Sequence, residues 1–268
     1  MEAAEITDFT RALKRAARAP WPRMGESHRA VLRAFAVEGL TTPIGDGDKK
    51  TAAPGTYRPV GPSCPSSCPF LPATETGAQS IDWQYITALQ ILGEACGLPQ
   101  RHIGDGGRTV AWTYTHEDDA GTVAALRLML PWLSIRHSDH SGRMGAVVVE
   151  RDEVPALRAE GLRPLVCPAT RMQTDCQRCR ACWERPDRLI VFPPHGAGKK
   201  KLRQRRAGEA ENTSKIAPCY AHNGNTGIQS RRATVDPWAS ARAAMAAVSW
   251  ARATGRLARL HVSGDFHR

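Results

Sequence analysis

Three cysteines recur at intervals of three positions, at Cys176, Cys179 and Cys182, within the stretch DCQRCRACW. Thiols spaced this closely seldom form disulfides, because two intervening residues let the backbone turn and direct successive sulfurs at one ion or cluster. Cys167 precedes them and completes a set of four. The set predicts either a tetrahedral zinc site or a structural or auxiliary iron-sulfur cluster, and the sequence does not separate the two.

A second group of thiols consists of Cys64 and Cys68, each followed by proline, and the distant Cys219. Together they predict a second metal site. The alternative is that the proline-flanked cysteines form tight turns with buried sulfurs. Cys96 lies inside an apolar helical pattern and is typical of an ordinary buried thiol.

The 268 residues are enough to bury a full core. No run approaches the roughly 18 apolar residues of a membrane span, and the N-terminus has alternating charge in place of the apolar part of a signal peptide. We therefore expect a cytoplasmic protein without membrane contact. In a reducing cytosol, eight cysteines favour metal binding over a disulfide framework.

The net charge of +11 and the pI near 9.6 favour anionic partners such as nucleic acid or nucleotides. Much of the excess comes from one basic run, which is either a contact surface or a solvated linker: Lys199, Lys200, Lys201, Arg203, Arg205 and Arg206.

Helical and strand patterns alternate along the chain. The expected helices cover residues 8–19, 26–37, 82–95, 122–130, 153–160 and 237–254. The expected strands cover residues 109–115, 132–136, 145–149, 163–166, 188–192 and 257–262. Residues 41–62 are rich in Gly, Asp, Thr and Pro and are expected to be irregular. The alternation predicts an α/β fold with a largely parallel sheet.

We expect four parts in the chain. Residues 1–55 form an N-terminal helical extension and linker. Residues 56–196 form an α/β core that contains a cysteine-rich metal-binding insert at 167–183. Residues 197–214 form a basic linker, and residues 215–268 form a displaced segment of the α/β core.

The stretch TYRPVGPSCPSSCPF at residues 56–70 resembles a phage and actinobacterial family of cysteine-rich proteins whose function is largely unassigned. Further motifs match the same family: WTYTH at 112–116, CPAT at 167–170, DCxxCxxCW at 175–183, FPPHG at 192–196, CYA at 219–221 and HVSGDF at 261–266. The likeness covers most of residues 56–266.

The order of these motifs departs from the family pattern, in which CYA and HVSGDF follow CPSSCPF closely and precede WTYTH. Moving residues 216–266 to the gap near residues 72–75 would restore that order, so the chain looks internally rearranged. We therefore expect strand 257–262 to pair in parallel beside strand 109–115, and helix 237–254 to cover one face of that sheet. The same packing would bring Cys219 close to Cys64 and Cys68.

In the restored order, the pieces are also similar to the radical S-adenosylmethionine superfamily. That likeness implies a partial or rearranged βα barrel in which Cys64, Cys68 and Cys219 hold a [4Fe-4S] cluster. It also implies that Tyr220, Gly264 and Asp265 contribute to the S-adenosylmethionine site. The third cysteine of the superfamily usually follows within two residues of the second, a position that Leu71 occupies here.

Two further side chains are catalytic candidates. His116 ends an expected strand, where sites in α/β proteins form, although it could equally be an ordinary core or surface histidine. Asp265 also follows a strand, and its alternative role is that of a helix N-cap.

The leading expectation is a radical S-adenosylmethionine-like iron-sulfur enzyme acting on a nucleotide or nucleic acid. The four-cysteine insert would hold zinc or a second iron-sulfur cluster. The alternative is a zinc-stabilised, phage-type nucleic-acid-binding protein without catalysis, which would use the basic run and the insert as its contact surface.

Overall fold

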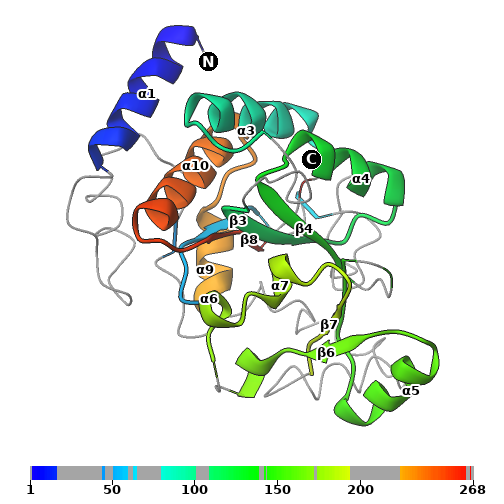
Figure 1. The fold of residues 1–268 in the computed structure, drawn as a ribbon. Helices are drawn as coiled ribbons and strands as arrows, with labels where there is room; N and C mark the ends of the chain where they lie inside the picture. The colour runs from blue at the N-terminus through cyan, green and yellow to red at the C-terminus, as the bar shows by residue number, and fades with distance from the viewer. Residues whose placement is uncertain are drawn as a thin grey trace.

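The computed structural model describes residues 2–16, 44–45, 51–59, 63–64, 80–100, 109–138, 142, 144–171, 174–193, 224–263 and 266. The expected helix at 26–37 and the expected linker at 197–214 lie outside these residues. The fold is built on one sheet with helices on both faces (Figure 1).

Within the described residues, eight strands pair side by side in the order β1-β2-β8-β3-β4-β5-β7-β6. The strands are β1 (Ile44–Gly45), β2 (Gly55–Tyr57), β3 (Ala111–Thr115), β4 (Leu133–Ser138), β5 (Gly145–Val147), β6 (Pro164–Val166), β7 (Leu189–Val191) and β8 (Ala258–Ser263). All neighbouring pairs are parallel except β1 with β2. The predicted α/β class with a parallel sheet is confirmed.

The helices mostly connect consecutive strands. They are α1 (Ala3–Ala16), α3 (Trp83–Ala95), α4 (Ala120–Met129), α5 (Val154–Ala159), α6 (Cys176–Cys179), α7 (Ala181–Glu184), α9 (Gly224–Arg232) and α10 (Pro237–Ala253), with short 3-10 helices at Arg151–Glu153 and Pro168–Arg171. No helix in the described part of the chain is both long and apolar enough to cross a membrane.

Aspartate caps begin the three longest helices that cover the sheet. The carboxylates of Asp82, Asp119 and Asp236 each accept the backbone N–H of the third residue of α3, α4 and α10, respectively. Gly97 follows α3 with φ +67°, a conformation that disfavours residues with a Cβ. The predicted cap of α3 and its end near Ala95 are therefore confirmed.

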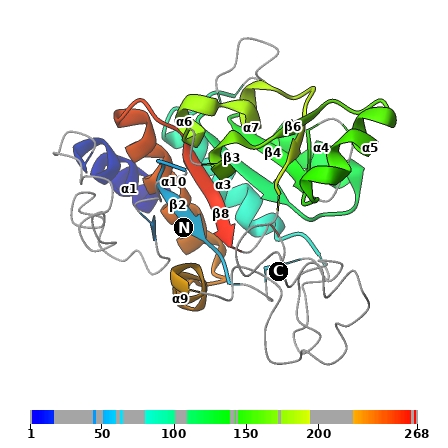
Figure 2. The same cartoon turned by 90° about the horizontal axis from the view of Figure 1, so that it is seen from below.

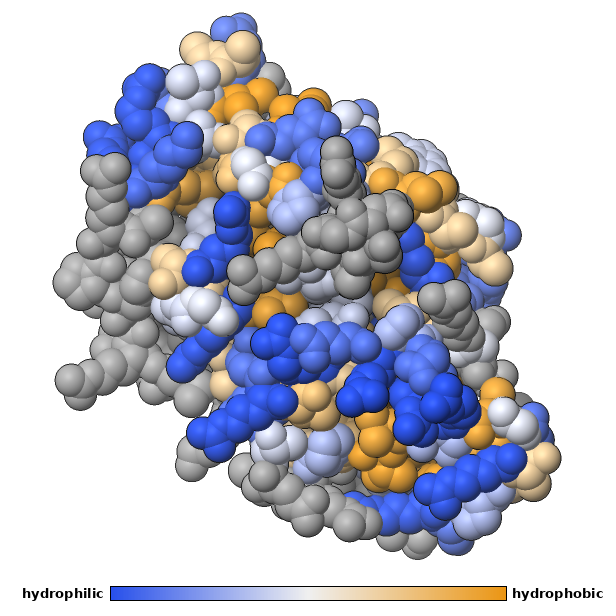
Figure 3. Space-filling view, in the orientation of Figure 1, coloured by the Kyte–Doolittle hydropathy of each residue, from blue (hydrophilic) through white to orange (hydrophobic). Residues whose placement is uncertain are grey.

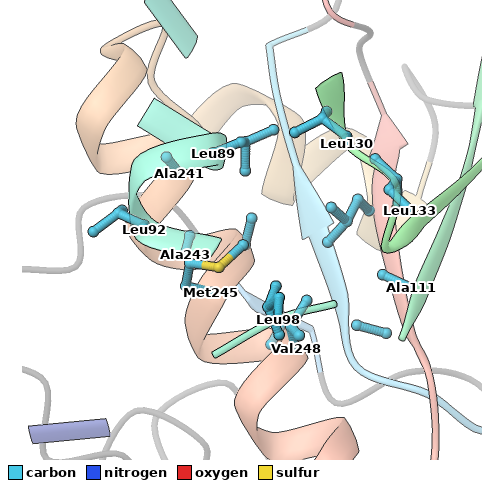
Figure 4. Packing of buried hydrophobic residues seen from close by; sticks show 14 of the residues in the cluster. Leu89, Leu92, Leu98, Ala111, Leu130, Leu133, Ala241, Ala243, Met245 and Val248 are labelled. Atoms are coloured by element: carbon cyan, nitrogen blue, oxygen red, sulfur yellow. The ribbon is translucent and has the colours of Figure 1, made fainter. Parts of the chain in front are cut away.

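Helices α3, α4 and α10 cover one face of the sheet with the larger core. Figure 4 shows leucines of α3 packed with the small side chains of α10 and with residues of β3 and β4. Helix α10 supplies mostly alanines, and Ala241, Ala243, Ala244, Ala246 and Ala247 are fully buried. Side chains this small let α10 lie close to α3 and to the sheet.

Side chains alternate between the two faces of β3 and β4, as the pleat of a strand requires. Ala111, Leu133 and Ile135 belong to the core under the helices. Trp112 belongs to a second core with residues of α7, and Arg136 donates to carbonyls of α7. The cysteine-bearing helices α6 and α7 therefore pack on the face opposite to α3 and α10 (Figure 1).

The predicted pairing of the C-terminal strand with β3 is confirmed. β8 lies parallel to β3, with Ala111 opposite Ala258 and Trp112 opposite Arg259. Its other neighbour is β2, also parallel, and Figure 2 shows β2 in blue beside β8 in red. Helix α10 covers this part of the sheet, as expected. A strand from the last tenth of the chain thus occupies the middle of the sheet.

The C-terminal segment also meets the start of α3. The N–H of Asp82 donates to the carbonyl of Phe266 at 2.8 Å, and Phe266 is fully buried. The end of β8 thus lies where a directly connected α3 would begin. In the restored order of segments, residues 216–266 would precede α3 directly, and that order requires the end of β8 to lie at this position.

Several elements differ from the sequence-based expectation. The stretch 41–62, expected to be irregular, contains β1 and β2, and Ile44–Gly45 of the expected extension pairs with β2. Helix α1 begins at Ala3, five positions earlier than expected. The short α6, α7 and α9 were not expected. In the described residues, no pairing joins β6 to β1, so the sheet has two open ends.

Candidate metal centre

The cysteine-rich segment is the connection between the parallel neighbours β6 and β7. Cys167 directly follows β6, and its N–H donates to the carbonyl of Val191 at 2.8 Å. Asp175 caps α6 by accepting the N–H of Arg178 at 2.9 Å. Arg180 adopts a left-handed conformation, φ +59°, and this turn separates α6 from α7. The C-x2-C spacing thus places successive cysteines on two short helices joined by a tight turn.

The four cysteines predicted as one set line a single small cavity, together with Leu165, Ala169 and Ile190. Cys167 and Cys182 are buried, whereas Cys176 and Cys179 are half-buried. None of the six cysteines that the structure describes takes part in a disulfide. The fold therefore brings the four predicted sulfur donors to one place.

The sulfurs do not form a closed ligand shell. Across the described ranges, no three or more Cys, His, Asp or Glu side chains are arranged to hold a metal ion. Burial raises the pKa of Cys182, although the Tyr114 hydroxyl and the Arg136 charge act in the opposite direction. Four soft donors around one cavity nevertheless match the chemistry of a tetrathiolate site.

Strands β3 and β4 contact this segment at Cys182, and Gln177 of α6 hydrogen-bonds to the backbone of Thr51 and Leu257, beside β2 and β8. The hydroxyl of Tyr114 donates to the Cys182 sulfur at 2.9 Å, and Ser134 Oγ donates to its carbonyl at 3.2 Å. Arg136 donates to the same carbonyl at 2.8 Å. Trp183 stacks near Trp112, with ring centroids 4.8 Å apart. These contacts fix α7 on β3 and β4.

Of the other predicted site, the structure describes Cys64 and His116, which follow β2 and β3 in the chain. Cys64 is buried and comes shortly after β2, where Ser63 closes a turn by donating from its N–H and hydroxyl to the Pro59 carbonyl. His116 directly follows β3 and is half-buried. The remaining predicted residues lie outside the described residues: Cys68, Cys219, Tyr220, Gly264, Asp265 and the basic run.

A buried polar network connects α3 with β8 and β3. Arg58 forms an ion pair with Asp82 at 2.7 Å, and its guanidinium lies 4.3 Å from the ring centroid of Tyr85. The Tyr85 hydroxyl lies 2.8 Å from Nε2 of His261, whose Nδ1 lies 3.3 Å from the hydroxyl of Thr113. All five side chains are buried.

Burial favours the neutral forms of His261 and Tyr85 within this network. Burial raises the pKa of Tyr85 well above its ordinary value. Burial and then the Arg58 charge hold the pKa of His261 well below its ordinary value. His261 also has φ +52°, an uncommon conformation for a non-glycine residue, and such positions cluster at functional sites.

Sequence reasoning did not identify Tyr114, Arg136 or the partners of His261. The one available signal for Arg136 was its position inside the apolar strand pattern LSIRH, since a charged residue there must find polar partners in the interior. For Tyr85 and Thr113 the sequence carries no comparable signal.

Comparison of the chain with family models, with curated proteins and with solved structures found no match.

Proposed function

We propose that this protein is an iron-sulfur enzyme of the radical S-adenosylmethionine-like type. The observation that carries the proposal is the order β2-β8-β3 of parallel strands. Carboxyl ends of parallel neighbours meet at one edge, which is where α/β proteins build their sites. Three separate motifs of the chain follow these three strands.

The strand register supports this alignment. Tyr57 at the end of β2 lies opposite Ser263 at the end of β8. The loop that carries Cys64 and Cys68 follows β2, Gly264 and Asp265 follow β8, and His116 follows β3. A cluster-binding loop, a cofactor-binding strand end and a candidate acid or base would thus share one edge.

In the proposed site, Cys64, Cys68 and Cys219 hold a [4Fe-4S] cluster, which leaves one iron open to a ligand. Gly264 and Asp265 bind S-adenosylmethionine beside Tyr220, and Asp265 and His116 are the candidates for proton transfer. Bound together, cluster and cofactor supply radical chemistry. The chain's own residues orient the cofactor and exclude water. The open sheet would be the partial barrel that surrounds this site.

The four-cysteine segment on the opposite face from α3 would hold a second metal, either zinc or a further iron-sulfur cluster. A nucleotide or nucleic acid is the proposed substrate, because the net charge of +11 favours anionic ligands and the basic run offers phosphate contacts.

The test is anaerobic purification followed by iron, sulfide and zinc analysis, visible absorption, and an assay for reductive cleavage of S-adenosylmethionine. We expect a brown protein that releases methionine and 5′-deoxyadenosine when dithionite is added. A Cys64→Ser, Cys68→Ser, Cys219→Ser triple variant should lose the cleavage and part of the iron. Cys96→Ser is the matched control, because Cys96 ends α3 outside both proposed sites.

A second candidate is a zinc-stabilised nucleic-acid-binding protein without catalysis. The observation that favours it is that four cysteines around one cavity match the ligand set of a structural zinc site. Colourless protein with zinc, no iron and salt-dependent nucleic-acid binding would overturn the enzyme proposal in favour of this one.

A further inference from the structure

Arg136 occupies an unusual position for a charged residue. It projects from β4 toward the cysteine-rich segment and is fully buried. A guanidinium carries five N–H donors, and each of the five donates to a different backbone carbonyl. Nε donates to Cys182 (2.8 Å), Nη1 to Gly145 (3.1 Å) and Arg188 (2.9 Å), and Nη2 to Ala181 (3.0 Å) and Arg185 (2.7 Å).

Four of these carbonyls belong to α7 and the turn that follows it. Helix α7 has only four residues, and its Ala181 carbonyl accepts the N–H of Arg185 at 3.3 Å. Arg136 adds donors from the sheet to the carbonyls of Ala181 and Cys182, at a helix end where carbonyls lack intrahelical partners. The outer side of α7 is hydrophilic, with Arg180, Glu184 and Arg185 exposed (Figure 3). The orientation of α7 is therefore fixed mainly from its inner side.

Cys182 is held by strand side chains through both its carbonyl and its sulfur. Arg136 and Ser134 hold its carbonyl, and Tyr114 holds its sulfur, so three side chains from β3 and β4 fix one residue. The helix that carries Cys176 is capped locally by Asp175. The position of Cys182 is thus fixed by the sheet before the four sulfurs bind a metal.

The charge of Arg136 calls for compensation. Burying a cation is costly unless it is paired. Among the described residues, no carboxylate forms an ion pair with Arg136. A metal held by four thiolates carries net negative charge on this side of the sheet. Such a centre, lying beside Cys182, would provide the missing counter-charge.

We propose that Arg136 is the positioning residue of the four-cysteine centre, fixing Cys182 and α7 for coordination and offsetting the thiolate charge. The inference rests on the metal centre of the proposed function. It assigns to Arg136 a role outside the ligand shell, of the kind whose loss typically weakens metal affinity by about 10- to 100-fold.

The experiment compares the full-length wild type with Arg136→Lys and Arg136→Met. Co²⁺ is added to the metal-depleted proteins in competition with a chelator, and its visible d–d bands report tetrahedral thiolate coordination. We expect Arg136→Lys to weaken Co²⁺ binding about 10- to 100-fold, because an ammonium group cannot serve five carbonyls in a plane. Arg136→Met should weaken it further, because the charge is also lost.

Arg127→Lys is the matched control. Arg127 on α4 donates from two nitrogens to the Ile135 carbonyl of the same strand, on the helix-covered face. Its replacement should leave the Co²⁺ affinity and spectrum unchanged. If the Arg136 variants do not fold, Tyr114→Phe decides, since it removes a single oxygen and should weaken binding roughly tenfold.

If the Arg136 variants fold and bind Co²⁺ with the affinity and spectrum of the wild type, the inference is overturned while the metal centre stays intact. If they do not fold, the same result in Tyr114→Phe overturns it. A wild type that shows no thiolate-bound Co²⁺ would overturn the four-cysteine centre itself, and the role of Arg136 with it. Zinc in place of iron in the purified protein would contradict the enzyme proposal alone.

Discussion

Asp82 performs two tasks at the beginning of α3. Its Oδ1 accepts the N–H of Tyr85, which caps the helix, and its Oδ2 pairs with buried Arg58. Asp119 performs only the first of these tasks, at the exposed start of α4. Comparing substitutions at the two caps therefore separates the contribution of the buried ion pair to stability from the contribution of helix capping.

We expect Asp82→Asn to lower the free energy of unfolding by about 3 kcal/mol, because asparagine still caps the helix but removes the buried carboxylate that pairs with Arg58. Asp119→Asn, which also keeps its cap, should stay close to the wild type. Urea denaturation of the three proteins measures the difference. Equal stability of the two variants would contradict the structural role of the pair.

We expect His261 to make the stability of the protein depend on pH. In the folded state its pKa lies well below the ordinary value of 6.5, so the ring is neutral when the protein is folded and binds a proton on unfolding at mildly acidic pH. The contribution of this group is thus fully present above about pH 6.5 and is lost as the pH falls further.

Between about pH 6.5 and 5.5 we expect the unfolding free energy of the wild type to fall by up to about 1.4 kcal/mol per pH unit on account of His261. His261→Gln should remove that part of the slope, whereas His116→Gln should retain it. Denaturant titrations at several pH values provide the measurement. If the slope of unfolding free energy against pH is unchanged in His261→Gln, the folded state binds a proton at His261 as readily as the unfolded state does.

The sequence indicated the sulfur donors of the candidate metal centre but not the residues that contact them. Cysteine spacing is a local signal, and the four predicted sulfurs do line one cavity. Arg136 and Tyr114 contact Cys182 across 46 and 68 positions of chain. Contacts at that separation depend on the strand order, which no local pattern of residue types specifies.

Helices and strands were predicted correctly where the local sequence pattern that specifies them is strong. Helices α3 and α10 have an aspartate cap and a long apolar pattern, and both were predicted to within one or two residues. Strand β2 has three residues, Gly55–Tyr57, and its burial comes entirely from tertiary packing. Helix α9 contains two glycines and is polar overall, so propensity argued against it.

The connection between β6 and β7 should depend on metal for its order. In the proposed centre, removing one thiolate takes away a ligand of a metal whose binding free energy would contribute directly to folding. We expect Cys176→Ser, Cys179→Ser and Cys182→Ser each to lower the metal content and to increase hydrogen exchange in α6 and α7. Strands β3, β4 and β8 should remain protected, because their core lies under the helices of the other face.

Cys96→Ser serves again as the control for this series, and a chelator should reproduce the effect of the three substitutions in the wild type. Unchanged metal content in all three variants would refute the four-cysteine centre.

For the whole molecule, the position of β8 is the main finding. It lies between β2 and β3 in the sheet. In the chain, however, β2 and β8 are separated by α3, by the strands β3 to β7 with their helices, and by α9 and α10. In parallel α/β folds, each strand and its helix contact their spatial neighbours whatever the order of the chain, provided that the connections reach. The sheet is therefore compatible with two chain orders, the present one and one in which β8 follows β2.

Moving residues 216–266 into the gap near residues 72–75 should accordingly give a protein with the same fold. The carbonyl of Phe266 already accepts the N–H of Asp82, so the new connection from the end of β8 to α3 would be short. The wild-type and rearranged chains should show matching amide spectra and similar unfolding free energies. Shorter connections between neighbouring strands would also speed refolding, because less loop-closure entropy is lost before β8 pairs.

The matched control inserts the same segment between β4 and β5, where β8 would have to cross the sheet to reach β2 and β3. That chain should fold poorly or lose the β3–β8 pairing. The contrary outcome is that the chain rearranged at residues 72–75 fails to fold while the control folds. That result would mean that β8 lies between β2 and β3 because of the present chain order. The inferred displacement of the segment would then be wrong.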